Sequence, residues 1–269
     1  MSLMNAQDVV DYGSLLDNHP ELLSLAIGKR RLKVSRWVSQ RLHDRVSYGP
    51  FAGMHMPWDS SWDPGARASM LLGLYEQEVL EKLVDRLGAV DLLVDVGAAD
   101  GYYAVGSVFS KRVGHALCFE DSERGRTMIA RTAQLNWVSD HLTIEGRADE
   151  SFVDVIKRLK QDRKLRRAPL ILMDIEGGEF ELIKPAVLED LRDASWIIEL
   201  HPFAVVDGDA RLRSLLVFAQ KTHRVELLGT TARDLSKFPE LQPLSDVDRW
   251  LLVVEGRPCS MQWLVLDPL

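Results

Sequence analysis

The fold is decided by one stretch, Leu92-Leu93-Val94-Asp95-Val96-Gly97-Ala98-Ala99-Asp100-Gly101-Tyr102-Tyr103. Its first five residues form a short, mostly apolar run, which is typical of a strand buried on both faces of a parallel sheet. The small residues that follow predict a tight turn where a ligand can approach the backbone closely. A strand, a small-residue turn and a helix in this order predict the crevice where doubly wound sheets bind nucleotides. The plainer alternative is an ordinary turn between a strand and a helix.

The composition is that of a globular protein with a sizeable core. The chain has 269 residues, of which 46% are hydrophobic and 27% are charged, and its net charge of −7 disfavours a general nucleic-acid binder. Two distant cysteines, Cys118 and Cys259, predict neither a disulfide framework nor a zinc site. Because we find no signal-peptide pattern and no membrane-spanning apolar run, we expect a cytoplasmic protein without a membrane partner. The sequence leaves the oligomeric state open.

The pattern along the chain changes near residue 88. Residues 1–88 are predicted to form a helical extension that caps the substrate site. Residues 89–269 alternate strands and helices, which predicts a doubly wound, mainly parallel α/β sheet covered by helices on both faces. We expect its strands at residues 92–96, 116–120, 142–145, 170–175, 196–200, 224–228, 249–254 and 263–266.

Two parts of the extension could contribute to function. The basic segment from Lys29 to Arg45 could contact nucleic acid or an anionic substrate, although a solvated helix face with its apolar residues turned inward is the favoured interpretation. The loop over residues 47–65 combines three prolines with large apolar side chains. It therefore either packs over the core or lines a substrate entrance.

Two acids near the first strands suggest an adenosine site. Glu120 lies roughly twenty residues beyond Gly97, the spacing at which an acid after the second strand accepts hydrogen bonds from a ribose diol. The alternative role for Glu120 is an acid at the start of the next helix. Asp95, in an apolar strand, should hydrogen-bond turn amides or the amino group of a cofactor, because a bare buried carboxylate is costly.

The turn departs from the dinucleotide fingerprint G-x-G-x-x-G. Gly97 and Gly101 flank Ala99, and Tyr102 stands where the last glycine would be needed. Asp100 inside the turn would repel a pyrophosphate but suits a cofactor with a cationic amino-acid end. S-adenosylmethionine joins an adenosine to an ammonium and a sulfonium, so the local charges favour it over NAD.

Two further motifs follow later strands, Asp174-Ile175-Glu176-Gly177-Gly178-Glu179 and Glu199-Leu200-His201. Together with the glycine turn, Glu120, Asn136 and Ala148, they make residues 90–202 resemble the FkbM family of S-adenosylmethionine-dependent methyltransferases. The segments Gly49–Met54 and Leu72-Gly73-Leu74-Tyr75-Glu76 also resemble upstream segments of some members.

The resemblance implies a fold and an activity. It implies a Rossmann-like methyltransferase sheet, typically of seven strands, and methyl transfer, usually to a hydroxyl oxygen of a small molecule or sugar. It also implies a set of residues that hold the cofactor: Asp95, Gly97, Asp100, Gly101 and Glu120, with Ala148 and Asp149 near the adenine.

One position departs from the family pattern. Members commonly carry a lysine two residues before the aspartate of the D-x-E motif, where this chain has Leu172. If that lysine helps to deprotonate the substrate, this protein does without it or acts on something else. The departure also leaves open a relative that binds the cofactor without turnover.

The chemistry is expected at the acidic ends of the fourth and fifth strands. Methyl transfer from a sulfonium depends on alignment, and a hydroxyl acceptor must also lose its proton to a base or near a metal. One hypothesis makes His201 the base, oriented by a carboxylate among Asp174, Glu176 and Glu199. Another makes Asp174, Glu176 and His201 ligands of a divalent metal. The plainer alternatives are a turn residue for His201 and a helix-start acid for Glu176.

The leading interpretation is therefore an O-methyltransferase acting on a small molecule or sugar. A nucleic-acid methyltransferase would use the basic segment, but the fourth strand lacks the Asn/Asp-Pro-Pro-aromatic signature used on flipped bases. A dehydrogenase is disfavoured by the glycine pattern. No motif identifies the methyl acceptor. We expect the loops over residues 47–65 and 230–248 to determine which acceptor is bound.

Overall fold

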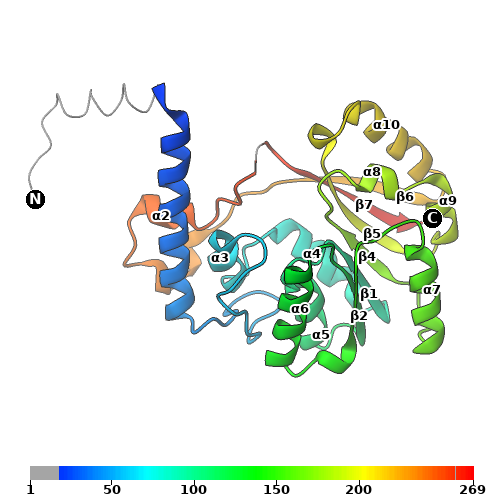
Figure 1. The fold of residues 1–269 in the computed structure, drawn as a ribbon, viewed down its shortest axis with the longest axis horizontal. Helices are drawn as coiled ribbons and strands as arrows, with labels where there is room; N and C mark the ends of the chain where they lie inside the picture. Colours follow the sequence, from blue (N-terminus) through cyan, green and yellow to red (C-terminus); the bar gives the residue numbers. More distant parts are fainter. Residues whose placement is uncertain (1–17, 258) are drawn as a thin grey trace, which may run out of the picture.

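A seven-stranded sheet runs through the computed structural model, which describes residues 18–257 and 259–269 (Figure 1). The strands lie in the order β3-β2-β1-β4-β5-β7-β6, and β7 runs antiparallel to both of its neighbours. This confirms the predicted doubly wound, mainly parallel α/β fold. The strands are β1 (Leu92–Val96), β2 (His115–Phe119), β3 (Leu142–Glu145), β4 (Leu170–Met173), β5 (Ser195–Leu200), β6 (His223–Gly229) and β7 (Gln262–Pro268).

Side chains of each strand point alternately to the two faces of the sheet. Apolar side chains therefore lie on both faces, and helices cover each of them. Leu93 of β1 belongs to the hydrophobic cluster that includes residues of α4 (Gln77–Leu87), α5 (Tyr102–Phe109) and α6 (Glu123–Leu135). Leu92 and Val94 belong to the other cluster. The helices of that face are α7 (Phe152–Asp162), α8 (Glu179–Leu182), α9 (Pro185–Asp190) and α10 (Gly208–Ala219).

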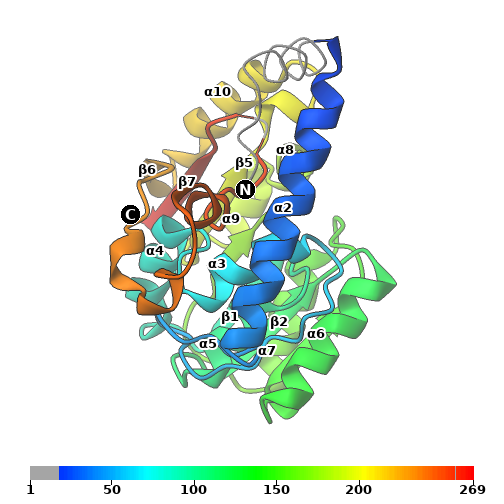
Figure 2. The ribbon, with the colours of Figure 1, turned by 90° about the vertical axis from the view of Figure 1, so that its left-hand side faces the viewer.

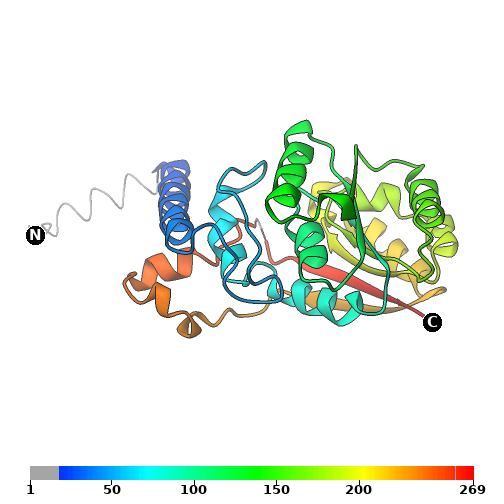
Figure 3. The same cartoon turned by 90° about the horizontal axis from the view of Figure 1, so that it is seen from below.

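The extension packs against the first of these faces. It holds α2 (Pro20–Arg41), a 3-10 turn at Pro64–Ala66 and α3 (Arg67–Leu71), and its apolar side chains join the same hydrophobic cluster as α4 and α5. Figure 3 shows α3 between α2 and the sheet. Residues 1–17, the first part of the predicted extension, lie outside the described residues.

The loop over residues 47–65 packs into the core with one part and lines a cavity with another. Phe51, Met54 and Met56 are fully buried in the core. Ser60 and Trp62, further along the same loop, line the cavity described below. The first half of the loop therefore fixes the extension to the sheet, and the second half forms part of the site.

The basic segment lies in and just after α2, where several of its arginines contact other parts of the chain. Arg30 forms two hydrogen bonds with Asp248, of 2.6 and 2.5 Å, and Arg31 pairs with Asp63 at 2.5 Å. Val34 and Leu42 are buried as the favoured interpretation predicts, but Leu32 is exposed and Arg31 is buried, so the helix does not have a purely solvated basic face. In the described part of the chain, no helix is long and apolar enough to cross a membrane.

The strand predicted at residues 249–254 is wrong. Residues 249–251 form the end of α11 (Asp246–Leu251), which lies beside α2 (Figure 2), and residues 252–254 follow the helix outside any strand. Ser245 caps the helix by accepting a hydrogen bond from the backbone N–H of Asp248, and two acids stand in its first turn. This capping and the favourable placement of acids at a helix N-terminus outweigh the β-branched residues of the segment.

The turn after β1 passes very close to the residues that follow β4. Gly97 has a φ of +89°, and a Cβ at this position would lie 1.8 Å from the backbone oxygen of Asp174. A side chain here would therefore strain the backbone and force the two strand ends apart.

We expect Gly97→Ala to lower the free energy of unfolding by about 2 kcal/mol or more, as strain and displacement combine. Gly88→Ala is the matched control, because Gly88 has a φ of −67° and open space where a Cβ would be. The control should stay within about 1 kcal/mol of the parent. Urea denaturation measures both, and equal stability of the two variants would contradict the close approach.

Candidate active site

A cavity of about 890 Å³ opens at the carboxyl ends of the parallel strands. Residues that follow β1, β2 and β4 line it, together with Glu199 of β5 and several side chains of the extension. This is the crevice that the doubly wound topology predicts. Residues 230–248, all of them described, contribute nothing to its lining, whereas the loop over residues 47–65 does.

Glu120 is fixed beside the glycine turn. Its Oε2 accepts a hydrogen bond of 2.9 Å from the backbone N–H of Ala99, and its Oε1 accepts two from Ser122. Gly125 leaves room for this carboxylate, since a Cβ there would lie 2.6 Å from its carboxyl carbon. Glu120 also lines the cavity. Its Oε2 therefore keeps capacity to accept a hydrogen bond from a ligand.

Asp95 is buried at the base of the same turn. Its Oδ2 accepts a hydrogen bond of 3.1 Å from the backbone N–H of Ala104, in the first turn of α5. Burial raises the pKa of Asp95 to about 7. A cationic ligand in the cavity would favour the charged form of this acid.

Asp100 has a partner that the sequence analysis missed. Its Oδ2 lies 2.8 Å from Nη2 of Arg67, and its carboxylate also accepts hydrogen bonds from Ser60 and Ser61. The side chains of Asp100 and Arg67 are only 4% and 1% exposed. The charge of Asp100 is thus already balanced, so it offers a cationic cofactor less attraction than its place in the turn suggests.

Ala148 and Asp149 line another part of the cavity, in the loop after β3. Asp149 is exposed, and its Oδ1 accepts hydrogen bonds from the backbone N–H and the hydroxyl of Ser151. These bonds lower the pKa of Asp149. Its carboxylate is therefore tied to the start of α7, and contact of these two residues with an adenine stays a prediction.

Three of the four residues predicted to be catalytic lie together. Nε2 of His201 is 3.6 Å from Oδ1 of Asp174 and 3.5 Å from Oε2 of Glu176. Asp174 and Glu176 follow β4 directly, and His201 follows β5 directly. Because β4 and β5 are parallel neighbours, their carboxyl ends bring these side chains to one edge.

Glu179 lies on the side of His201 away from Asp174 and Glu176 and is hydrogen-bonded to its backbone. It is fully buried, and its carboxylate accepts hydrogen bonds from the backbone N–H groups of His201 (2.7 Å) and Gly177 (2.8 Å). Its Oε1 also lies 3.4 Å from Nδ1 of His201. Burial lowers the pKa of His201, but Glu179 and the nearby carboxylates outweigh burial and leave that pKa raised. The D-x-E-G-x-E motif contained this residue without indicating its role.

Glu199, the fourth predicted residue, lies in a second acidic group with Glu76 and Asp174. The Arg257 guanidinium bonds to Glu199, to Glu76 at 2.6 Å and to Glu255 at 2.9 Å. Its charge only partly offsets the effect of burial, which raises the pKa of both Glu76 and Glu199 to about 8. Burial and the Glu76 carboxylate also raise the pKa of Asp174 to about 7.

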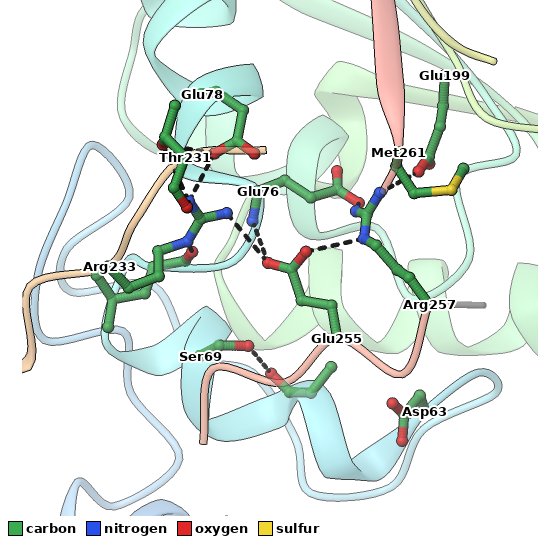
Figure 4. Close-up of polar contacts among 12 residues, drawn as sticks. Asp63, Ser69, Glu76, Glu78, Glu199, Thr231, Arg233, Glu255, Arg257 and Met261 are labelled. Atoms are coloured by element: carbon green, nitrogen blue, oxygen red, sulfur yellow. Dashed lines mark hydrogen bonds and ion pairs between the residues drawn. The ribbon is translucent and has the colours of Figure 1, made fainter. Parts of the chain in front are cut away.

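The Arg257 contacts belong to a longer buried network. Glu255 also accepts hydrogen bonds from the backbone N–H of Glu76 and from Arg233, which pairs with Glu78 at 2.7 Å (Figure 4). The network joins the segment before β7 to the start of α4 and to β5. A sequence pattern pointed to Glu76, through its likeness to upstream family segments, and none pointed to Arg257.

Leu172 occupies a wall of the cavity. It lies in β4 in register with Asp95 of β1 and Ile197 of β5. The position where the resembled family carries a lysine is therefore apolar here. Among the described residues, Glu76 and Glu199 are bound instead by a cation from the segment before β7, Arg257.

We expect the pH dependence of stability to report on Glu199. A folded pKa of about 8, above the usual 4.5, means that the folded chain binds this proton more tightly than the unfolded chain. The stabilising contribution is therefore complete below the unfolded pKa and is lost as the pH rises toward the folded value. Glu199→Gln cannot ionise and should not show this loss.

Urea denaturation at about pH 5 and about pH 8 should show the parent losing on the order of 2 kcal/mol or more relative to Glu199→Gln. Glu181→Gln, at an exposed position beside the same cavity, should keep the pH dependence of the parent. Parallel pH profiles for the parent and Glu199→Gln would contradict the raised pKa.

No family model and no curated protein matches this chain. Solved structures similar to it include a precorrin-6Y C5,15-methyltransferase from Geobacter metallireducens (14% identity, TM-score 0.46, covering 72% of this chain and 89% of that one). They also include an O-methyltransferase from Bacillus cereus in complex with SAH (13%, 0.42, 71% and 80%). A third is an m1A22 tRNA methyltransferase from B. subtilis (11%, 0.39, 70% and 64%). With identities and TM-scores this low, the likenesses carry no argument about substrate or mechanism.

Proposed function

We propose that this chain is an S-adenosylmethionine-dependent methyltransferase that methylates a hydroxyl group of a small molecule or sugar. The observation that carries the proposal is the placement of Glu120, which is fixed by three hydrogen bonds beside the glycine turn and lines the cavity. A carboxylate held at the end of the second strand can accept hydrogen bonds from a ribose diol. Asp95 adds a buried carboxyl group beneath the same turn, and a cationic ligand would favour its charged form.

The same cavity contains the groups that an acceptor needs. It extends from the glycine turn to Asp174 and Glu176, next to His201. In the proposed reaction, the acceptor oxygen attacks the methyl carbon of the sulfonium as the carbon–sulfur bond breaks. The hydroxyl proton passes to a base at this edge, either His201 or one of the carboxylates Asp174 and Glu176 that line the cavity beside it, and the products are a methyl ether and S-adenosylhomocysteine.

The alternatives find less support in this geometry. The case for a nucleic-acid methyltransferase depended on the basic segment, but Arg30 and Arg31 are engaged with Asp248 and Asp63 of the same chain. A relative that binds the cofactor without turnover would have no need of the His201 cluster. Formation of S-adenosylhomocysteine with any hydroxyl acceptor distinguishes an enzyme from such a relative.

We expect the chain to bind S-adenosylhomocysteine and Glu120→Gln to bind it at least about 10-fold more weakly, because hydrogen bonds to a charged acceptor contribute about 1.5–3 kcal/mol. Glu123→Gln is the matched control, since Glu123 is an exposed acid of the same loop and helix start. Isothermal titration calorimetry measures all three proteins.

Two results of this titration would contradict the proposal. One is equal affinity of Glu120→Gln and Glu123→Gln for S-adenosylhomocysteine, which would show that Glu120 does not bind the ribose. The other is tight binding of NAD with no binding of S-adenosylhomocysteine, which would restore a dehydrogenase.

A further inference from the structure

We propose that Asp174, Glu176 and His201 bind one divalent transition-metal ion at the edge of the cavity. The ion would activate the acceptor hydroxyl, and that role rests on the proposed methyl transfer, whereas binding of the ion does not. The three residues offer one imidazole nitrogen and two carboxylate oxygens, all within 4.8 Å of one another.

The spacing of these atoms suits ligands better than hydrogen-bond partners. Nε2 of His201 lies 3.6 Å from Asp174 and 3.5 Å from Glu176. A charge-assisted hydrogen bond would hold such atoms about 2.7–2.9 Å apart. Two ligand atoms that each lie about 2.1 Å from one tetrahedral ion are separated by about 3.4 Å. The observed gaps are therefore close to those of a metal centre.

His201 supplies a second, independent observation. Its side chain is only 3% exposed, and Nε2 faces the two carboxylates at 3.6 and 3.5 Å, which is longer than a charge-assisted hydrogen bond. Oδ1 of Asp174 is also buried, and among the described residues it has no hydrogen-bond partner. An unpaired buried oxygen is costly, and a cation bound between these residues would satisfy Oδ1 of Asp174 and at the same time give Nε2 of His201 a partner.

Glu179 gives the imidazole the support that metal-binding histidines commonly have. Its fully buried carboxylate lies 3.4 Å from Nδ1 and holds the His201 backbone N–H at 2.7 Å. With Nδ1 facing a carboxylate, Nε2 is the ring nitrogen that can bind a metal. The ring is thus positioned from behind with its other nitrogen facing the carboxylates.

The neighbouring acidic group makes a poorer metal site. Glu76, Asp174 and Glu199 also come within 4.8 Å of one another, but Arg257 already binds Glu76 and Glu199. The Asp174–Glu176–His201 group carries two carboxylates, and its Glu176 is 56% exposed at the cavity. An ion there would keep open positions for an acceptor oxygen.

The mixture of ligands indicates which ions suit the site. Imidazole suits zinc and other transition ions, and carboxylates suit manganese, whereas calcium and magnesium prefer oxygen ligands alone. We therefore expect Mn²⁺, Co²⁺ or Zn²⁺. With His201 as a ligand and not the base, an acceptor hydroxyl bound to the ion would lose its proton more readily to solvent water, and its oxygen would then attack the sulfonium methyl carbon as the carbon–sulfur bond breaks.

The test titrates the chelator-treated full chain with Mn²⁺ and measures bound ion by electron paramagnetic resonance. We expect one ion per chain. Glu176→Gln and His201→Gln should each weaken binding at least about 10-fold, since each removes a ligand. Glu181→Gln, whose side chain is 74% exposed beside the same cavity, should bind as the parent does. If His201→Gln does not fold, Glu176→Gln carries the test, because its side chain is largely exposed.

The outcomes separate the metal site from the proposed function. No binding of Mn²⁺, Co²⁺ or Zn²⁺ by the parent would overturn the site, as would loss of binding in Glu199→Gln but not in Glu176→Gln. Calorimetry with S-adenosylhomocysteine uses the same preparations. Binding of that ligand without any metal binding overturns the metal site alone. Metal binding by the predicted residues without S-adenosylhomocysteine binding supports the site and contradicts the proposed methyl transfer.

Discussion

The site depends on one constraint, the crowding of carboxylates at the ends of the central strands. Burial alone would drive Glu76 and Glu199 to their neutral forms, and the Arg257 guanidinium offsets part of this cost by binding both. Breaking a buried ion pair typically costs about 3–5 kcal/mol. Arg257 also lies 4.7 Å from the centre of the Trp263 ring in β7. The antiparallel strand and the segment before it therefore hold the acidic edge together.

The extension completes this site. Arg67 neutralises Asp100 in the glycine turn, Glu76 at the start of α4 binds Arg257, and Asn136 forms two hydrogen bonds with the backbone of His55. These contacts fix the extension to three different parts of the sheet domain. The side chains that line the cavity opposite the strand ends therefore have fixed positions, which favours alignment of an acceptor with a methyl donor.

Local patterns predicted the parts of the fold that depend on neighbouring residues. The turn after β1, the ends of the parallel strands and the meeting of Asp174, Glu176 and His201 follow from alternating strands and helices. The roles of Arg67 and Arg257 did not, because each binds carboxylates 33 or more residues away, and no local pattern encodes such pairs. The contact of Glu199 with Arg257 is distant in sequence in the same way, and the strand predicted at residues 249–254 is wrong because Ser245, outside that segment, caps α11.

In the proposed function, an adenosyl cofactor lies between Glu120 and the acidic edge of the cavity. A crystal structure of the chain with S-adenosylhomocysteine bound tests this most directly. We expect the ribose hydroxyls on the Glu120 carboxylate and the sulfur facing the side of the cavity formed by Asp174 and Glu176, next to His201. A ligand bound elsewhere, or with its sulfur turned away from these three residues, would contradict it.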